Sequence, residues 1–116
     1  MTLQEFYKKT GGELDEVLRR LMSERLILKY VKKFPEDPHF SQLSRAVAQQ
    51  DYETAYRAVH TLKGLCLSLG FLKLSKPVIA LTTELREGNT AHLQAYFAEI
   101  ATAYEELLTW IAQLEG

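Results

Sequence analysis

One histidine in this chain stands among residues that suit nucleophilic chemistry. His60 occurs in the segment AVHTLKGLCLSLG, with Arg57 three residues before it and Lys63 three residues after it. On a helix, residues three apart share a face, so two cations would flank the imidazole. A histidine nitrogen is a competent nucleophile near neutral pH, and nearby cations would offset the charge of an anion attached to it. The spacing therefore suits an anionic adduct on His60.

Gly64 lies one turn after His60 and on the same helical face. Glycine in a helix interior costs about 1 kcal/mol relative to alanine, so its use there calls for a reason. A missing side chain would lower the surface beside the imidazole and let another molecule approach the ring. The alternative interpretation is that a solvent-facing histidine with basic neighbours is common on helices and that the glycine is incidental. Spacing alone does not decide between the two.

The elements that must position these residues follow from the apolar spacing. Apolar side chains recur at intervals of three and four, and no stretch alternates with period two, which predicts helices and essentially no strand. We predict helices over residues 2–8, 13–21, 23–34, 38–49, 51–69, 71–87 and 90–114. The predicted core stripe of the fifth is Ala55, Val59, Leu62, Cys66 and Leu69. His60 falls on a different face, which also carries Glu53, Tyr56, Arg57, Lys63, Gly64 and Leu67 and should point outward.

Capping residues, glycines and prolines indicate where these helices begin and end. Asp51 is expected to cap the helix over 51–69, and Gly70 to end it. The segment 88–90 (Gly-Asn-Thr) is expected to end one helix and cap the last. Two points stay open at this stage. Pro77 marks either a later helix start or a kink, and the segments 38–49 and 51–69 are either nearly continuous or bent at residues 50–51.

Together these helices predict an all-α fold. Short connections favour antiparallel neighbours, so we expect an antiparallel four-helix bundle over about residues 23–114, with short additional helices at the N-terminal end. A length of 116 residues suits a single domain over residues 1–116. Met1 at the start favours a chain that acts alone.

Charge and composition exclude several function classes. The net charge of −1 offers no bulk attraction to nucleic acid or a membrane surface, although residues 51–76 carry a local basic excess. The chain lacks an apolar run long enough to cross a membrane and lacks the apolar core of a signal peptide, so we expect a cytoplasmic protein. The single cysteine, Cys66, rules out an intrachain disulfide, and His39, His60 and His92 lack zinc-ligand spacing.

The string from His60 to Gly70 resembles the motif of histidine phosphotransfer (HPt) domains. That motif has a histidine, a lysine at +3, a glycine at +4 and a glycine at +10, and His60, Lys63, Gly64 and Gly70 match all four. The resemblance covers roughly residues 23–110 and implies a helical bundle. It also implies that His60 is the phosphoacceptor, that Lys63 lies near the phosphoryl oxygens and that Gly64 gives clearance for a partner.

The resemblance further implies how such a protein works. It would relay a phosphoryl group between His60 and the aspartates of receiver domains, in response regulators or hybrid histidine kinases, without kinase activity of its own. The chain would bind no cofactor or metal, because the receiver supplies Mg²⁺. Its oligomeric state stays open at this stage, with a monomer as the default expectation. We expect Tyr56, Arg57, Leu67 and Lys73 to contact the partner. Many family members have a small or polar residue where Leu67 stands, so Leu67 either anchors the receiver or restricts partner choice, or is an ordinary exposed leucine.

Two other functions compete with the phosphocarrier. The first is a helical adaptor that binds receivers or other signalling proteins while His60 stays unphosphorylated. The second is an enzyme in its own right. Against the enzyme, the sequence has no P-loop, no glycine-rich ATP loop and no serine–histidine motif, and 116 residues leave no room for an ATP-binding domain.

Overall fold

The computed structural model describes residues 1–115, and all regular structure in that range is helical. The elements are α1 (Leu3–Thr10), α2 (Leu14–Leu21), α3 (Glu24–Lys33), the 3₁₀ turn η1 (Phe34–Glu36), α4 (His39–Ala48), α5 (Tyr52–Leu69), α6 (Leu72–Arg86) and α7 (Leu93–Ala112). The prediction of an all-α fold is confirmed. None of these helices has the length and hydropathy needed to cross a membrane.

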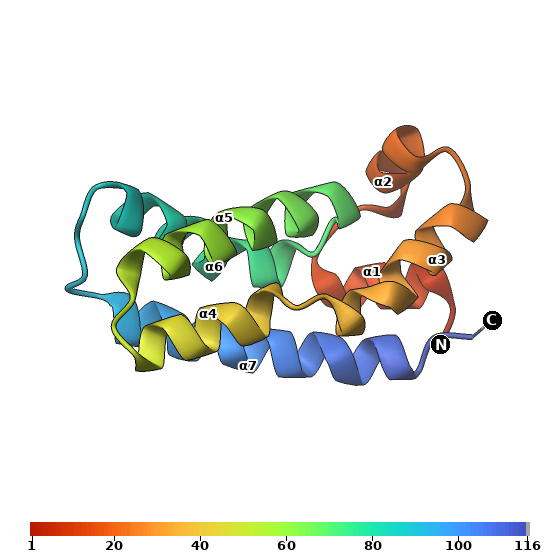
Figure 1. Ribbon diagram of the computed structural model, residues 1–116. Helices are drawn as coiled ribbons and strands as arrows, with labels where there is room; N and C mark the ends of the chain where they lie inside the picture. Colours follow the sequence, from red (N-terminus) through yellow and green to blue (C-terminus); the bar gives the residue numbers. More distant parts are fainter. Residues whose placement is uncertain (116) are drawn as a thin grey trace.

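The four helices α4 to α7 lie side by side, and successive helices run in alternating directions along the chain (Figure 1). Helix α3 and the turn η1 lead into α4 along the same line. The short helices α1 and α2 gather at the end of the assembly where α5 finishes and α6 begins (Figure 1). The N-terminal helices therefore sit beside the C-terminal end of the helix that carries His60.

The core is formed by the apolar stripes of all these helices. The predicted stripe of α5 is buried along its whole length, since Ala55, Val59, Leu62, Cys66 and Leu69 are each less than a tenth exposed. Burial of this face fixes the rotation of α5 about its axis, because turning the helix would expose five apolar side chains. The opposite face of α5 therefore points to solvent, and this face carries His60.

A cluster of aromatic rings ties the N-terminal end of the chain to the bundle. The ring of Phe71 meets those of Phe6 and Phe34 edge to face, with centroids 6.0 Å and 5.1 Å apart. Phe6 in turn meets Tyr7 at 5.2 Å. Edge-to-face pairs add roughly 0.5–1.5 kcal/mol each beyond the burial of their area. Helix α1 is thus an integral part of the fold.

The ends of α5 form as the sequence predicts. The Asp51 carboxylate accepts the backbone N–H of Thr54 at 3.2 Å and its hydroxyl at 2.7 Å, and these hydrogen bonds hold the pKa of Asp51 below its usual range. Gly70 ends the helix with a φ of +74°, a left-handed conformation that glycine adopts without strain. Between α4 and α5, Gln50 has a φ of +55°, so the chain turns back there. Of the two alternatives for residues 50–51, the bend is correct.

Two other sequence predictions need correction or resolution. The last helix begins at Leu93 rather than at residue 90, because the Asn89 side chain accepts the N–H of Ala91 at 2.9 Å and holds the segment in a turn. Thr90 therefore does not cap α7. Helix α6 begins at Leu72 and continues through Pro77, so the alternative of a later start is wrong. A proline there only leaves one carbonyl without its usual helical donor.

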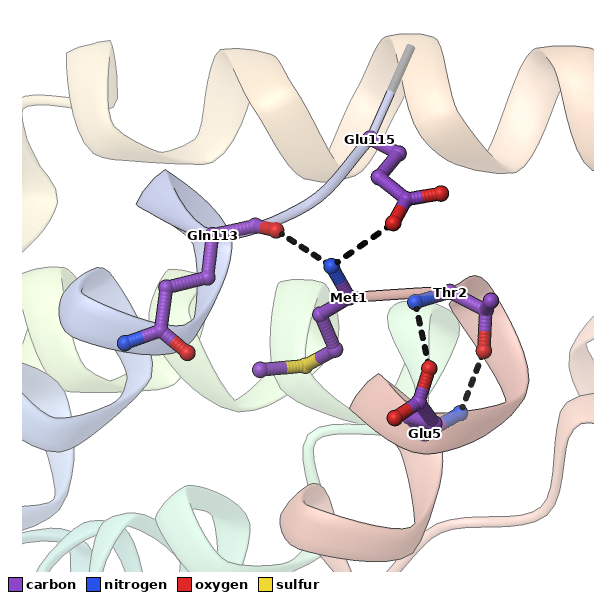
Figure 2. A network of polar contacts seen from close by, with 5 residues as sticks. All are labelled: Met1, Thr2, Glu5, Gln113 and Glu115. Atoms are coloured by element: carbon purple, nitrogen blue, oxygen red, sulfur yellow. Dashed lines mark hydrogen bonds and ion pairs between the residues drawn. The ribbon is translucent and has the colours of Figure 1, made fainter.

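The first residues pack against the end of α7, as Figure 2 shows. The Met1 amine donates to the Gln113 carbonyl at 2.9 Å and to Glu115 Oε1 at 3.2 Å, and the Glu115 N–H donates back to the Met1 carbonyl. Thr2 and Glu5 cap α1 reciprocally, each side chain accepting the other's backbone N–H. These contacts fix the start of α1 before it crosses to the end of α5.

Candidate functional site

His60 lies in the middle of α5 with its side chain exposed to solvent. Its ring packs beside that of Tyr56, one turn earlier, with centroids 5.8 Å apart and planes inclined by 48°. Neither imidazole nitrogen has a hydrogen-bond partner among residues 1–115. The ring is therefore steadied on one side by an aromatic neighbour while both nitrogens remain open to chemistry.

The two cations predicted beside His60 differ in their surroundings. Arg57 Nη1 lies 2.8 Å from Glu53 Oε1, and its Nη2 donates to Thr54 Oγ1 at 3.4 Å, so the guanidinium turns toward the start of α5 and away from His60. Lys63 is half-buried and has no ion-pair partner in the described part of the chain. Lys63 is thus the cation on α5 whose charge is uncompensated near His60.

Gly64 leaves open space beside the imidazole. A Cβ placed on Gly64 would have nothing within 4 Å, apart from its own helix backbone. The absence of a side chain is therefore not required by packing within this chain. Leu67, seven residues after His60 and on the same face, is 48% exposed. An accessible backbone patch and an apolar side chain thus adjoin the histidine.

The structure does not bring Lys73 into this group. Its ammonium lies over the ring of Trp110, 5.4 Å from the centroid, on the side of α6 that faces α7. A cation over an indole face is an attractive contact that also covers the end of the bundle. Lys73 therefore contacts Trp110 and not the histidine face. The other predicted site residues share one face of α5: Tyr56, Arg57, His60, Lys63, Gly64 and Leu67.

Two exposed residues of α6 escaped the sequence analysis. Leu72 is 43% exposed and lines a groove together with Leu67, and Ile79 is 38% exposed two turns further along the same strip. Helices α5 and α6 are antiparallel neighbours, and Leu67 and Leu72 line the same groove near the turn that joins them. The spacing of seven between Leu72 and Ile79, outside the buried stripe of α6, was the pattern that could have revealed them. Leu67 and Leu72 thus form exposed apolar surface at the C-terminal end of the helix that carries His60.

The C-terminal end of α5 is capped by side chains from the two N-terminal helices. The Tyr7 hydroxyl donates to the Leu69 carbonyl at 2.7 Å, and burial raises the pKa of that phenol. The Arg20 guanidinium donates to the Leu67 carbonyl at 3.0 Å and to the Ser68 carbonyl at 3.0 Å and 3.2 Å. Carbonyls in the last turn of a helix otherwise lack donors, and a cation there also opposes the helix dipole.

The other two histidines have carboxylate partners. His39 Nδ1 lies 3.0 Å from Asp37 Oδ2, and His92 Nδ1 lies 2.6 Å from Glu84 Oε1. His60 is thus the histidine whose two nitrogens are both unoccupied. Over residues 1–115, no three side chains of His, Cys, Asp or Glu lie close enough together to hold a metal ion. Cys66 is buried in the core, and burial raises the pKa of its thiol to about 12.

Comparison with known proteins adds one finding. Residues 35–110 match the family model described as Hpt domain. The match spans most of the turn η1, all of α4, α5 and α6, and most of α7, so it includes His60 and its neighbours on α5. Helices α1, α2 and α3 lie outside it. No curated protein and no solved structure in the comparison matches the chain.

Proposed function

Because this chain belongs to the Hpt domain family, we propose that His60 is its phosphoacceptor and relays phosphoryl groups between receiver-domain aspartates in a multistep phosphorelay. Domains of this family serve histidine phosphotransfer in phosphorelays. The observation that carries the assignment to His60 is its unobstructed imidazole, whose nitrogens have no partner in the described chain and which lies one turn from the open backbone of Gly64.

The transfer itself is a nucleophilic displacement at phosphorus. The lone pair of His60 Nε2 forms the new P–N bond while the P–O bond of the aspartyl phosphate breaks, and the electron pair returns to the aspartate as a carboxylate. The proton on Nδ1 is free to leave to solvent, because no group among the described residues accepts it. The reverse displacement returns the phosphoryl group to a receiver. Atoms and charge balance without any additional reactant.

Lys63 supplies the positive charge that this step needs from the chain. It lies three residues after His60, so its ammonium can reach the phosphoryl oxygens as they approach Nε2. Charge-assisted hydrogen bonds of this kind are roughly twice as strong as neutral ones. Arg57 plays a lesser part while it remains paired with Glu53. The Tyr56 ring limits the orientations that the imidazole can take.

The partner completes the reaction. An incoming receiver would bring the phosphorylated aspartate and the Mg²⁺ that neutralises its phosphoryl oxygens. This chain itself would bind no cofactor and would have no ATP-dependent kinase activity. It would act as a monomer in the cytoplasm. Gly64 gives the rim of the receiver pocket room to reach Nε2. Leu67 and Leu72 provide exposed apolar surface at one end of the histidine face, which suits docking because the fully buried centre of an interface is more apolar than its rim.

Phosphoryl transfer to His60 can be tested with two donors. A phosphorylated receiver and the small donor phosphoramidate should both label the wild-type chain, and His60→Gln should abolish both labels while the circular dichroism spectrum stays helical. His92→Gln and His39→Gln serve as matched controls and should label normally. Label that persists in His60→Gln would place the acceptor elsewhere. A wild-type chain that binds receivers but takes up no label from either donor would instead be a helical adaptor.

A further inference from the structure

Helix α2 lies outside the matched region of the chain, yet it is anchored next to the His60 face. Arg20 holds the Leu67 and Ser68 carbonyls, and Val17 is fully buried. A Cβ on Gly70 would lie only 2.7 Å from Val17 Cγ2, so α2 packs directly on the turn that ends α5. The placement of α2 is therefore set by specific contacts with the helix that carries the phosphoacceptor.

A groove of about 400 Å³ runs between α2 and the α5–α6 turn. One wall is formed by α2 and the residues before it, and the other by the exposed side chains of Leu67 and Leu72. The charged side chains that line it are Glu13, Glu16 and Arg20. Arg20 is occupied by the carbonyls of α5, whereas Glu13 and Glu16 are exposed and have no ion-pair or side-chain hydrogen-bond partner among residues 1–115. The hydrogen bonds of Arg20 go to neutral carbonyls and leave its positive charge in place, so two carboxylates and one guanidinium give the lining a net charge of −1.

The groove falls within reach of any protein that docks on His60. One partner of a stable complex usually buries about 800 Å², which corresponds to a disc about 16 Å in radius. Leu67 lies seven residues from His60, which is about 10 Å along the helix axis. A receiver centred on His60 therefore covers Leu67 and meets the groove beside it.

The charges on this surface form an ordered pattern. Lys63 places positive charge next to His60, which suits a partner whose phosphorylated aspartate lies in an acidic pocket. Glu13 and Glu16 place negative charge at the far side of Leu67. Charge patterns of this kind set the orientation of a complex and discriminate between partners more than they raise affinity.

We propose that α2 forms part of the receiver-docking surface, and that Glu13 and Glu16 select receivers that carry a basic side chain beside their aspartate pocket. This inference rests on the proposed function of His60. The basic side chain would enter the groove between α2 and Leu67, while the pocket closes over the imidazole. The N-terminal helices thus have two roles, since they cap the end of α5 and also contribute to partner choice.

The test compares two phosphoryl donors on the full chain. The double variant Glu13→Lys/Glu16→Lys is assayed with the phosphorylated receiver that labels the wild type fastest, and separately with phosphoramidate. The expected result is a KM for the receiver raised about tenfold, with kcat and the rate of labelling by phosphoramidate unchanged. The control Glu99→Lys/Glu105→Lys makes the same change of net charge on exposed positions of α7 and should keep the wild-type KM.

Two results would count against the inference. An unchanged or lowered KM in the α2 variant would overturn it, as would an equal rise in KM in the α7 control, which would reveal an effect of net charge alone. Neither result touches the role of His60, because labelling by phosphoramidate reports on that role independently. If phosphoramidate fails to label His60 in the wild type, the proposed function itself fails.

Discussion

The ring of Tyr56 lies beside the ring of His60, with centroids 5.8 Å apart and planes inclined by 48°. This contact joins the phosphoacceptor to the preceding turn of its own helix and restricts the rotation of the imidazole. An oriented nucleophile reacts faster than a freely rotating one. The aromatic ring, rather than the hydroxyl, makes this contact.

Removal of the Tyr56 ring should therefore slow the reaction of His60. Tyr56→Ala should lower the rate of labelling by phosphoramidate several-fold, while Tyr56→Phe should keep it near the wild-type value. The measurement is the initial rate of phosphohistidine formation at saturating donor. Equal rates in the Ala and Phe variants would show that the contact between the two rings does not orient the imidazole.

The positive charge of Lys63 should raise the rate of phosphoryl transfer, and its side chain should contribute little to the stability of the fold. Lys63→Ala is expected to slow transfer from a receiver roughly 10²-fold, as removal of one donor to a developing anion does elsewhere. Lys63→Arg keeps the positive charge and should retain more of the rate than Lys63→Ala. Thermal unfolding of all three proteins provides the control. An alanine variant with wild-type kinetics would remove Lys63 from the site.

Gly64 should be a position where stability and function respond in opposite directions. A Cβ there meets nothing within 4 Å, so Gly64→Ala should raise the free energy of unfolding by about 0.5–1 kcal/mol through helix propensity alone. Gly64→Gln, by contrast, should slow transfer from a receiver at least tenfold, because its side chain fills the space the partner needs. Urea unfolding measures the first effect, and receiver kinetics measure the second.

Labelling of Gly64→Gln by phosphoramidate is the control, since a small donor needs no such clearance. It should proceed at the wild-type rate. If labelling by both donors falls equally, Gly64 acts on the nucleophile and not on docking.

Gly12 should show the opposite stability response. A Cβ on Gly12 would overlap the Gly70 carbonyl oxygen, so the junction between the N-terminal helices and the end of α5 must open to admit it. We expect Gly12→Ala to lower the free energy of unfolding by about 1–3 kcal/mol, as overpacking does in other close-packed interiors. Urea denaturation alongside Gly64→Ala makes the comparison direct. A neutral Gly12→Ala would mean that this junction is loosely held.

Cys66 should give the fold a measurable dependence on alkaline pH. Burial raises the pKa of its thiol to about 12, whereas an unfolded cysteine titrates near 8.5. Between these values the folded chain keeps a proton that the unfolded chain loses. The contribution of Cys66 to the free energy of unfolding is therefore fully present below about pH 8 and decreases as the pH rises. The slope of unfolding free energy between pH 8.5 and 9.5 should be smaller in Cys66→Ala. An identical slope in the variant would contradict the burial of the thiol.

Much of the site could be predicted because its determinants are local. The outward direction of the His60 side chain follows from the apolar periodicity of α5. Ala55, Val59 and Leu62 must be buried together, so the opposite face is exposed to solvent. Asp51 and Gly70 mark the ends of that helix because capping depends on a few adjacent residues. The start of α7 was predicted three residues too early, because Asn89 forms a turn that competes with a helix start at Thr90.

Two other features depend on which of several partners a long side chain contacts, and spacing left that choice open. Arg57 looked like a companion of His60, but its guanidinium bonds to Glu53, which lies on the same face. Lys73 looked like part of the basic rim, but α7 brings Trp110 beneath its ammonium. In both cases a long, flexible side chain had several partners within reach, and only the packed structure selects one of them.

The sequence alone was thus sufficient for the helices, for the exposure of His60 and for the open backbone at Gly64, because periodicity and residue type act within one or two turns. Only the tertiary structure decided that Tyr7 and Arg20 cap the end of α5, and that Glu13 and Glu16 line a groove together with Leu67. Those contacts join residues about 50 to 60 positions apart. They exist because the free carbonyls at the end of α5 need donors that the helix itself cannot supply.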